Sequence, residues 1–573
     1  MRLNVRSALE LAIRPAGLQS AGLGAITLEF AIPGNLQDTS ALMILRSPFP
    51  DVPIPDVTLG EFVFEHAGGW WNEPALIDGS SGRVLTYGGL RTLIEHCRAA
   101  LRTRGFGRGD VLCLYSPNVP EYAAVFFAVA ELGGTNTTAN PLYGAEELAR
   151  QLKDSGAKII VTAPQLAEKA RAAAAAAGIK EVVAWADAPG CTAFAAFASG
   201  ASGASGASAH AAPPQPVKPS RDVVALPYSS GTTGLPKGVM LTHRNLVANL
   251  AQIEFSDSTE PGDHLVGVLP FFHIYGMTVV LCGVLRKGGC VVTMPQFDLE
   301  QYLRLTSTYG VKRAFLVPPI ALALAKHPIV DQFDLSRLKF VTSGAAPMGR
   351  ELEVSCAARI GCVVKQGYGM TEASPVTHFT PEDPAFVRHG SCGLLVPNTE
   401  CRIVNLETTK DVAPGEQGEL LIRGPQIMLG YLNNPDATAQ AVDDDGWLHT
   451  GDVGYADADG FFYIVDRLKE FIKYKGFQVA PAELEGVLLT HPAVADCAVI
   501  PMADAEAGEV PKAFVVTRHD VTSEELMEYV AGVVASFKKV RSVEFIEKIP
   551  KSPSGKILRR ELIALERSRT VPS

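Results

Sequence analysis

The chain has 573 residues, of which 47% are hydrophobic and 20% charged, and these values exclude disorder throughout. Its net charge of −10 gives no sign of the basic surface that nucleic-acid binding requires, so we expect a soluble protein without a nucleic-acid partner. A single hydrophobic core stops growing at roughly 250–300 residues, which predicts several domains. The ten cysteines form no CxxC pair, which favours reduced thiols in an intracellular protein over a zinc or redox site.

The first 42 residues have two interpretations. Several arginines within an apolar pattern are typical of a transit peptide, whereas Glu10 is not. Alternatively, this stretch is an extension before a true start at Met43. We expect a cytoplasmic protein, with organellar import through residues 1–42 as the alternative; residues 570–573 are not an SKL-type peroxisomal signal.

Helix and strand patterns alternate from residue 85 onward. The predicted elements are a helix over 85–105, a strand over 110–118, a helix over 121–134 and a strand over 157–164. This alternation predicts an α/β fold with parallel sheets.

Two stretches depart from the alternation. Residues 187–220 are rich in Ala, Gly, Ser and Pro, which predicts a flexible surface loop within the first domain. Residues 265–285 carry no formal charge, but Pro270 would break a spanning helix. We therefore expect buried core there, and no transmembrane segment.

A second change of pattern occurs near Asp466. Beyond it, strand patterns over 496–502 and 512–518 and a helical pattern over 523–537 predict a small α+β unit. The predicted domains are an extension at 1–42, a large domain at 43–465 and a small domain at 466–573. The oligomeric state stays open between monomer and homodimer.

The sequence SSGTTGLPKG at 229–238 is typical of a phosphate-binding loop. Its glycines allow positive φ and close approach of the backbone, whose N–H groups then form a nest for anions. The alternative is a polar turn, and Pro236-Lys237-Gly238 excludes a Walker A loop. The residues predicted to hold phosphates are Ser229, Ser230, Gly231, Thr232, Thr233, Gly234 and Lys237.

Four further motifs accompany this loop: QGYGMTE (366–372), HTGDVGY (449–455), DRLKEFIKYKGFQVAPAELE (466–485) and PKSPSGKILRREL (550–562). Together they resemble the adenylate-forming superfamily of acyl-CoA synthetases, peptide-synthetase adenylation domains and beetle luciferases. FFHIYG (271–276), VPPI (317–320) and SGAAPMGRELE (343–353) are most similar to 4-coumarate:CoA ligases.

The resemblance implies an α/β fold with a large N-terminal region of several subdomains and a small α+β C-terminal lid on a hinge. It implies that a carboxylic acid and ATP form an acyl-AMP, which a thiol then attacks. The implied cofactors and partners are ATP, Mg²⁺, coenzyme A and the carboxylic acid.

The resemblance also implies roles for particular residues. The implied nucleotide contacts are Gln366, Gly367, Tyr368, Gly369, Thr371, Asp452 and Arg467. Glu372 is the implied Mg²⁺ contact, since magnesium at phosphates keeps only one or two carboxylates. Lys556 is the implied catalytic lysine, because a positioned ammonium stabilises charge that develops at the α-phosphate.

The implied second step needs a rotation of the lid. Lys469 matches the hinge, Lys473 and Gln478 match contacts on the AMP side, and Lys475 and Gly476 match coenzyme A contacts. A solvated basic strip is the alternative explanation of these lysines.

The acid pocket is implied at His273, Tyr275, Ala345, Gly367 and Met370. A lone histidine beside aromatic residues is usually part of a core, but the matched FHIY stretch favours a role in adenylation. Gln296 and Thr342 stand where coumarate ligases commonly carry lysine, which weakens the assignment of the acid.

We therefore predict an acid:CoA ligase for 4-coumarate or a related hydroxycinnamate. The alternatives are a ligase for a medium- or long-chain fatty acid or another aryl-alkanoic acid, and a luciferase-type oxidoreductase. A non-catalytic relative would lack Lys556, Glu372 or Asp452, and all three are present.

Overall fold

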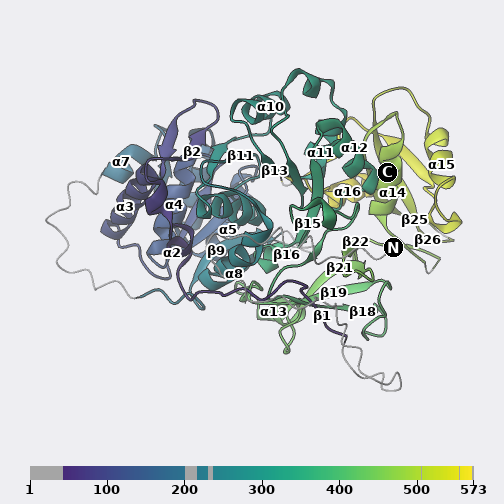
Figure 1. Ribbon diagram of the computed structural model, residues 1–573, viewed down its shortest axis with the longest axis horizontal. Coiled ribbons are helices and arrows are strands. Elements are labelled where there is room, and N and C mark those ends of the chain that lie inside the picture. The colour runs from purple at the N-terminus through teal and green to yellow at the C-terminus, as the bar shows by residue number, and fades with distance from the viewer. Residues whose placement is uncertain are drawn as a thin grey trace.

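The computed structural model describes residues 43–199, 216–229, 236–475, 477–504, 506–553 and 555–570. The predicted extension at 1–42, the loop residues 230–234 and Gly476 lie outside the described residues. A large N-terminal region, coloured purple to green in Figure 1, carries a small yellow C-terminal region at one end. The fold is therefore α/β with a separate small domain, as predicted.

An eight-stranded sheet forms one side of the N-terminal region. Its order is β20-β10-β9-β5-β4-β6-β7-β8. The bounds are β4 Val111–Tyr115, β5 Thr135–Ala139, β6 Ala157–Thr162, β7 Glu181–Ala184, β8 Thr192–Ala193, β9 Val223–Ser229, β10 Lys237–Thr242 and β20 Gly430–Tyr431. The strands from β9 to β8 are parallel, which confirms the prediction from the helix–strand alternation.

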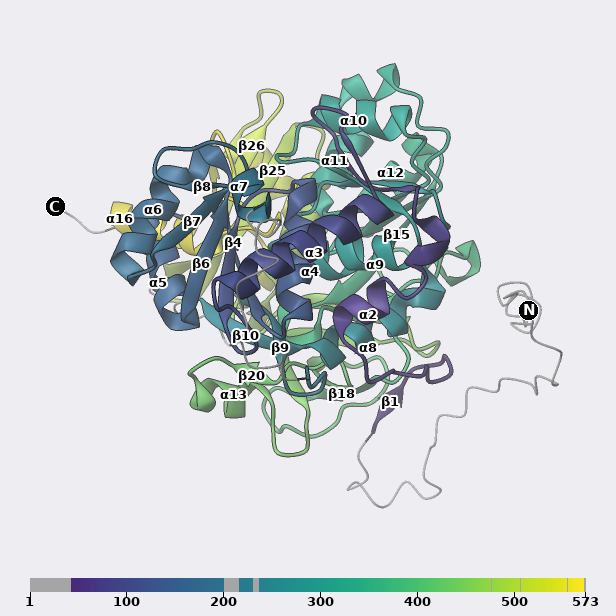
Figure 2. The same cartoon turned by 90° about the vertical axis from the view of Figure 1, so that its left-hand side faces the viewer.

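Helices cover both faces of this sheet (Figure 2). They are α3 Tyr87–Thr103, α4 Pro120–Glu131, α5 Ala145–Ser155 and α6 Ala167–Ala177. Alternate residues of β4 serve the two sides, because Leu112 and Leu114 belong to the core with α3 and α4, and Cys113 and Tyr115 to the core with α5 and α6.

Two further sheets complete the centre of the molecule. One has the order β11-β12-β2-β3 and the other β13-β14-β15-β16-β17. The bounds are β2 Pro74–Asp78, β3 Val84–Thr86, β11 His264–Gly267, β12 Cys290–Thr293, β13 Arg313–Leu316, β14 Phe340–Ser343, β15 Val363–Gly369, β16 Val376–Phe379 and β17 Leu394–Leu395. The helices around them are α2 Leu59–Val63, α8 His243–Ile253, α9 Gly283–Arg286, α10 Leu299–Thr308, α11 Pro318–Lys326 and α12 Arg350–Ile360.

The charge-free stretch at 265–285 lies within this centre. It contains the end of β11, a π-helix over Tyr275–Cys282 and the start of α9, and most of its apolar side chains are buried. No helix in the described part of the chain is long and apolar enough to cross a membrane. The prediction of buried core is therefore confirmed.

An antiparallel sheet leads toward the C-terminal region. Its order is β1-β18-β19-β21-β22, with bounds β1 Leu45–Arg46, β18 Glu400–Val404, β19 Gly418–Arg423, β21 Leu448–Ala456 and β22 Phe462–Arg467, and α13 Pro435–Ala441 lies beside it. Asp452 and Arg467 are direct partners across β21 and β22. Strand β22 thus runs through the predicted domain boundary at residue 466.

The C-terminal region has its own hydrophobic core, which includes Ile472, Leu484, Val499, Val515 and Leu526. Its elements are β23 Ile472–Tyr474, β24 Phe477–Val479, α14 Pro481–Thr490, β25 Val494–Asp504, β26 Gly508–Thr517, α15 Ser523–Ala531, β27 Ser542–Phe545 and α16 Arg559–Thr570. The predicted strands at 496–502 and 512–518 and the helix from 523 correspond to β25, β26 and α15.

The low-complexity stretch at 187–220 differs from its prediction at its start. Strand β8 and helix α7 (Phe194–Ser199) form there, because Phe194 and Phe197 are buried and Phe194 packs edge-on against Trp185. Residues 200–215 lie outside the described residues. Two aromatic side chains thus anchor a segment that its composition marked as a loop.

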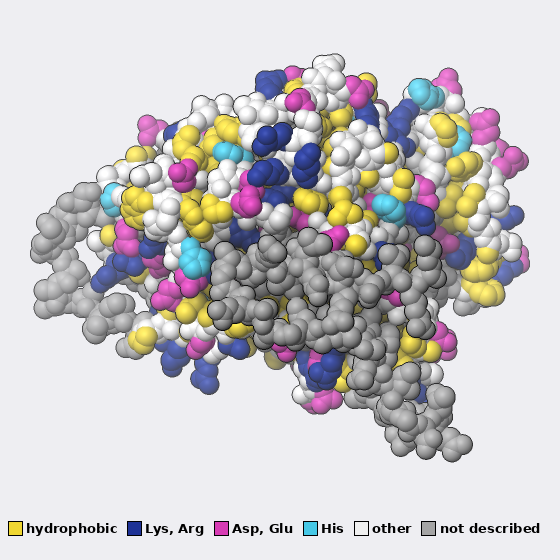
Figure 3. Space-filling view, viewed as in Figure 1, with side chains coloured by type: hydrophobic (Ala, Val, Ile, Leu, Met, Phe, Trp, Pro, Cys, Tyr) yellow, Lys and Arg dark blue, Asp and Glu magenta, His cyan; other side chains and the backbone are white. Residues whose placement is uncertain are grey.

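The surface carries both signs of charge. On the face shown in Figure 3, acidic and basic side chains are interspersed over the described surface, with one group of Lys and Arg side chains near the centre. This pattern accords with a net charge that is only moderately negative for 573 residues.

Candidate active site

A cavity of about 1620 Å³ lies between the N-terminal sheets and the C-terminal domain. Parallel strands present their carboxyl ends to such a crevice, which is the usual ligand site of α/β folds. The predicted site residues that line it are Ser229, His273, Ala345, Gln366, Gly367, Tyr368, Gly369, Thr371, Asp452, Arg467, Lys469 and Lys556. Elements far apart in the sequence therefore meet at one cavity.

Asp452 is held at the wall of the cavity by two partners. Its Oδ2 accepts a 2.6 Å hydrogen bond from the hydroxyl of Tyr368, and its Oδ1 lies 3.2 Å from Nε of Arg467. Burial raises the pKa of the Asp452 carboxyl, while Arg467 and Tyr368 oppose that shift. The result is an oriented carboxylate with free lone pairs, which is suited to accept hydroxyl groups.

Glu372 and Lys237 meet at a residue that the sequence analysis missed. The hydroxyl of Tyr431 donates a 2.9 Å hydrogen bond to Oε1 of Glu372. The ε-ammonium of Lys237 lies 4.5 Å from the centre of the Tyr431 ring. Tyr431 thus links the end of the glycine-rich loop to the implied magnesium contact, and only the pairing of β20 with β10 could have revealed it.

Lys556 enters the cavity from the C-terminal domain. Its loop is closed by a 2.8 Å hydrogen bond from Ser552 N–H to the Lys556 carbonyl and by a 3.1 Å bond from Lys556 N–H to Ser552 Oγ. Burial, and next the nearby Arg467, lower the pKa of Lys556 to about 8, while Asp452 and Glu372 act in the opposite direction. The ammonium therefore shares one electrostatic environment with the groups that resemble a nucleotide site.

Gly555 allows this loop to approach the N-terminal region. Its φ is +79°, and an added Cβ would lie 3.0 Å from Val317 Cγ2 and 3.5 Å from Pro319 Cδ. Both contacts are with the VPPI segment at 317–320. Glycine is needed here both for its backbone conformation and for the space.

His273 and Tyr275 lie at the start of the π-helix. Nδ1 of His273 accepts a 3.3 Å hydrogen bond from Tyr275 N–H, and burial together with Lys556 lowers the pKa of His273 to about 3. A neutral imidazole is therefore expected at neutral pH. The Tyr275 hydroxyl donates to the Thr342 carbonyl at 3.3 Å, and the ring covers Gly344, where a Cβ would lie 2.9 Å from Tyr275 Cε1.

Not every residue implied for the acid pocket lines the cavity. Ala345 does, with φ of +70°, and Gly367 does as well. Among the described residues, Tyr275 and Met370 stand behind the wall, where Met370 packs against the core. Gly369 is required by the fold itself, because a Cβ there would lie 2.0 Å from the Pro375 carbonyl oxygen.

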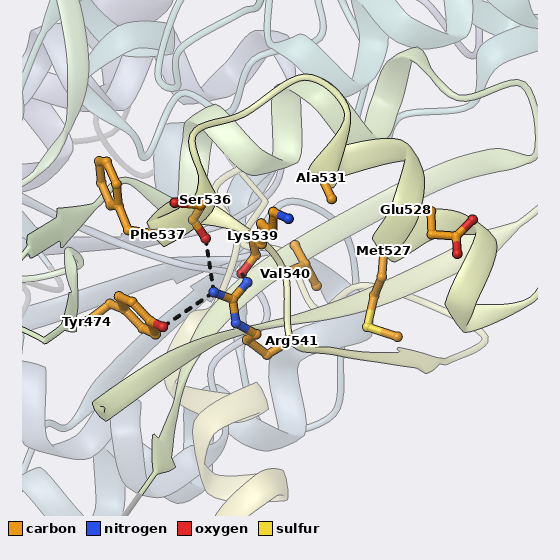
Figure 4. A pocket seen from close by; sticks show the side chains of 9 residues that line it. All are labelled: Tyr474, Met527, Glu528, Ala531, Ser536, Phe537, Lys539, Val540 and Arg541. Atoms are coloured by element: carbon orange, nitrogen blue, oxygen red, sulfur yellow. Dashed lines mark hydrogen bonds between the residues drawn. The ribbon is translucent and has the colours of Figure 1, made fainter. Parts of the chain in front are cut away.

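The hairpin of β23 and β24 faces away from this cavity. Lys473, Lys475 and Gln478 are exposed on it and do not line the cavity, and Lys475 pairs with Glu506 at 2.5 Å. A second, shallow cavity of about 620 Å³ adjoins the hairpin at Tyr474 (Figure 4). The structure thus separates two groups of predicted residues that lie close together in the sequence.

The second cavity has a polar edge. Arg541 donates to the Tyr474 hydroxyl at 3.4 Å and to the Ser536 carbonyl at 3.0 Å, and Lys539 stands beside it (Figure 4). Its other wall is apolar, with Met527, Ala531 and Val540. A basic edge next to apolar surface suits an anionic ligand with a flat ring system.

Comparisons with known proteins agree with this geometry. Residues 63–432 match the AMP-binding enzyme family, and residues 483–556 match its C-terminal domain. The chain is 45% identical to 4-coumarate–CoA ligase 5 of Oryza sativa subsp. japonica over 91% of its length and 97% of the relative. It is 44% identical to 4-coumarate–CoA ligase 1 of Petroselinum crispum over 92% of its length and 98% of the relative.

A solved structure extends the comparison to the fold. ATP-bound MatB from Rhodopseudomonas palustris is 26% identical, with a TM-score of 0.78, over 90% of this chain and all of that one (100%). The chain therefore belongs to the AMP-binding enzyme family. It is an adenylate-forming acid–thiol ligase whose sequence is similar to those of 4-coumarate–CoA ligases, and this confirms the resemblance of its motifs.

Proposed function

We propose that this enzyme joins a hydroxycinnamate of the 4-coumarate type to coenzyme A, by way of an acyl-AMP formed in the large cavity. The observation that carries the proposal is the position of Lys556, which shares the cavity with Asp452 and His273. Relatives named 4-coumarate–CoA ligases, at 44–45% identity over nearly their whole length, support the choice of acid.

In the first half-reaction, Asp452 and Arg467 would hold the ribose, and Tyr368 and Gly367 would form the wall for the adenine. Oδ1 and Oδ2 of Asp452 are already oriented by their partners, so the ribose hydroxyls meet a carboxylate that needs no rearrangement. The main-chain glycines leave the adenine room to lie flat. Ser229 and Lys237, at the two ends of the glycine-rich loop, would contact the phosphates.

The fit of Mg²⁺ depends on Glu372. This carboxylate is buried, and Tyr431 orients one of its oxygens, which suits a hard cation that retains most of its water. Within the described residues, no group of three or more His, Cys, Asp or Glu side chains could hold a metal alone. Mg²⁺, when bound, would neutralise part of the phosphate charge, with Glu372 as its protein contact.

Lys556 would stabilise the charge that develops as the acid carboxylate attacks the α-phosphate and pyrophosphate leaves. The carboxylate is ionised at neutral pH, so no general base is required. The partly buried position strengthens the contact, because an ammonium acts more strongly away from bulk water. The neutral His273 imidazole can donate a hydrogen bond to the acid without adding charge.

In the second half-reaction, the C-terminal domain would rotate about Lys469 and present the β23–β24 hairpin to the acyl-AMP. Lys473 and Gln478 would then approach the AMP, and Lys475 the coenzyme A. The exposed hairpin and the basic edge at Lys539 and Arg541 support this, since both face solvent while Lys556 occupies the cavity. Each half-reaction would use a different face of one small domain.

A panel of carboxylic acids tests the proposal. 4-Coumarate, other hydroxycinnamates, benzoate and fatty acids of several lengths are supplied with ATP and Mg²⁺, and pyrophosphate release and thioester formation are measured with and without coenzyme A. We expect the highest kcat/KM with a hydroxycinnamate. If none of the acids in the panel causes pyrophosphate release, the adenylation assignment is overturned.

The same panel separates the alternatives. A preference for fatty acids would overturn the choice of acid and leave the reaction intact. Pyrophosphate release without thioester would instead favour an oxidoreductase of the luciferase type.

A further inference from the structure

Gln366 lines the cavity, and both ends of its side-chain amide are hydrogen-bonded within the protein. Its Oε1 accepts a 3.0 Å hydrogen bond from Met348 N–H, and its Nε2 donates to the Met348 carbonyl at 2.9 Å. The same Nε2 donates to Oε2 of Glu353 at 2.8 Å. The amide therefore holds the loop at 345–349 through two hydrogen bonds to the main chain of Met348.

Glu353 lies in α12, directly behind this wall, and its side chain is only 1% exposed. Besides Gln366, it accepts a 2.8 Å hydrogen bond from Nδ1 of His389 and a 3.0 Å bond from Gly390 N–H. Three donors from two other segments thus converge on one buried carboxylate. Hydrogen bonds to a charged acceptor are stronger than those between neutral groups.

The carboxylate decides which way the Gln366 amide points. A carboxylate accepts but cannot donate, so only the Nε2 end of the amide can face Glu353. Oε1 must then face Met348 N–H, and this is the arrangement that the loop requires. Ala345, in the same loop, has a φ of +70°, which strains a non-glycine residue and needs support from its surroundings.

We propose that Glu353 is a positioning residue for the nucleotide and the acid, which acts through Gln366 to hold the 345–349 loop and through Gly390 to hold a second segment of the wall. This inference rests on the proposed assignment of the large cavity to ATP and the acid. Glu353 itself does not line the cavity, whereas Met348, Gly349, Gln366 and Gly390 all do. Glu353 therefore acts by fixing the position of the residues that line the cavity.

Two substitutions of Glu353 separate this role from mere filling of space. Glu353→Met keeps an unbranched chain of similar volume but removes both acceptors. Glu353→Gln keeps one acceptor, which can still face Gln366 and Gly390 while its amide N–H₂ donates to the other tautomer of His389. We expect the Kd for ATP, measured by titration calorimetry without any acid, to rise about tenfold for Glu353→Met and less than about threefold for Glu353→Gln.

Gln366→Met tests the same link from the other side. If Glu353 acts through Gln366, the two losses do not add. The double variant Glu353→Met with Gln366→Met should then have a Kd for ATP no higher than that of the single variant that binds ATP more weakly. Additive losses would mean that the two residues act separately, and would overturn the inference. ATP binding by Glu353→Met and Gln366→Met equal to that of the wild type would overturn it as well.

Folding is monitored by thermal melting, with the exposed Glu168→Gln in α6 as the control for loss of a carboxylate. If Glu353→Met does not fold, the other two variants carry the test. The Kd for ATP should then rise about tenfold for Gln366→Met and less than about threefold for Glu353→Gln. With the preferred acid, KM should rise more than kcat falls, whereas a loss of folded enzyme alone lowers only the apparent kcat. The calorimetric result does not depend on which acid is the substrate, so failure of the acid assignment remains distinguishable.

Discussion

Tyr431 donates its hydroxyl hydrogen to Oε1 of Glu372 at 2.9 Å, across two segments that are 59 residues apart in the sequence. The ring of Tyr431 makes a second contact, because the ammonium of Lys237 lies over its face. Burial, with Glu372 adjacent, raises the pKa of Tyr431, so the phenol stays a donor at any physiological pH. One tyrosine therefore couples the phosphate loop to the proposed magnesium contact.

Tyr431→Phe should weaken the response to magnesium. The substitution keeps the ring under Lys237 and removes only the donor to Glu372. Loss of about 1 kcal/mol predicts a roughly fivefold higher Mg²⁺ concentration for half-maximal pyrophosphate release. Tyr529→Phe, in α15 of the C-terminal domain, is the control. An unchanged Mg²⁺ dependence would remove Tyr431 from this role.

Lys556→Ala should separate the two half-reactions. Adenylation, followed as pyrophosphate release, should fall on the order of 10²–10³-fold, because a charge contact in the transition state is lost. Thioester formation from supplied acyl-AMP and coenzyme A should continue near the wild-type rate. The exposed Lys548→Ala serves as the control. Equal loss of both half-reactions would contradict the assigned role.

The pH profile of adenylation should have an alkaline limb set by Lys556. Burial lowers its pKa to about 8, so the ammonium is present below that pH and is lost as the pH rises through it. We therefore expect kcat/KM for adenylation to decline above about pH 8, since this parameter reports groups of the free enzyme. In Lys556→Arg the remaining activity should lack this limb. A limb at the same pH in the arginine variant would assign it to another group.

Gly555→Ala should hinder the seating of the Lys556 loop. The residue has φ of +79°, and the new Cβ would meet Val317 at 3.0 Å. The left-handed conformation alone costs about 1–2 kcal/mol, which predicts a drop in adenylation of roughly tenfold. Thioester formation from acyl-AMP should be spared.

Gly532→Ala is the matched control, because its φ is −73° and its nearest added contacts are at 3.6 Å. Comparable loss of adenylation in both glycine variants would show that the effect comes from stability of the C-terminal domain, which thermal melting would then reveal.

Lys475→Ala should affect only the second half-reaction. The side chain is exposed on the hairpin, away from the large cavity, and pairs with Glu506. Pyrophosphate release without coenzyme A should stay within about twofold of the wild type, because exposed ion pairs contribute little. The KM for coenzyme A should rise several-fold in the thioester assay. A change confined to adenylation would contradict the proposed division of faces.

Local patterns predicted much of the fold. The helix expected over 85–105 is α3, which begins after the cap at Thr86 and ends before Gly105, whose φ is +73°. The segment at 187–220 was harder, because its composition masked the burial of Phe194 and Phe197. The periodicity of a sequence shows which residues share a face of a helix or strand, but it does not show which of them become buried against another element.

The candidate site was partly predictable for the same reason. Asp452 and Glu372 stood out by their motifs, and both lie at or beside the cavity. Tyr431, Glu353 and His389 could not be found, because their importance comes from contacts with residues 13 to 59 positions away. Gln366, which the motif implied as a nucleotide contact, lines the cavity, and its side-chain amide is hydrogen-bonded to Met348 and Glu353.

The sequence by itself determined the chemistry available to this protein: glycines and hydroxyls suited to phosphates, a carboxylate suited to magnesium, and lysines near the C-terminus. The motifs pointed to Lys556 by resemblance, but only the tertiary structure placed its side chain in the large cavity. Lys556 lies in the cavity and has a pKa lowered by burial, while Lys473 and Lys475 face solvent. The physical reason is that burial and charge proximity arise when the small domain packs against the large one, and no local pattern encodes that contact.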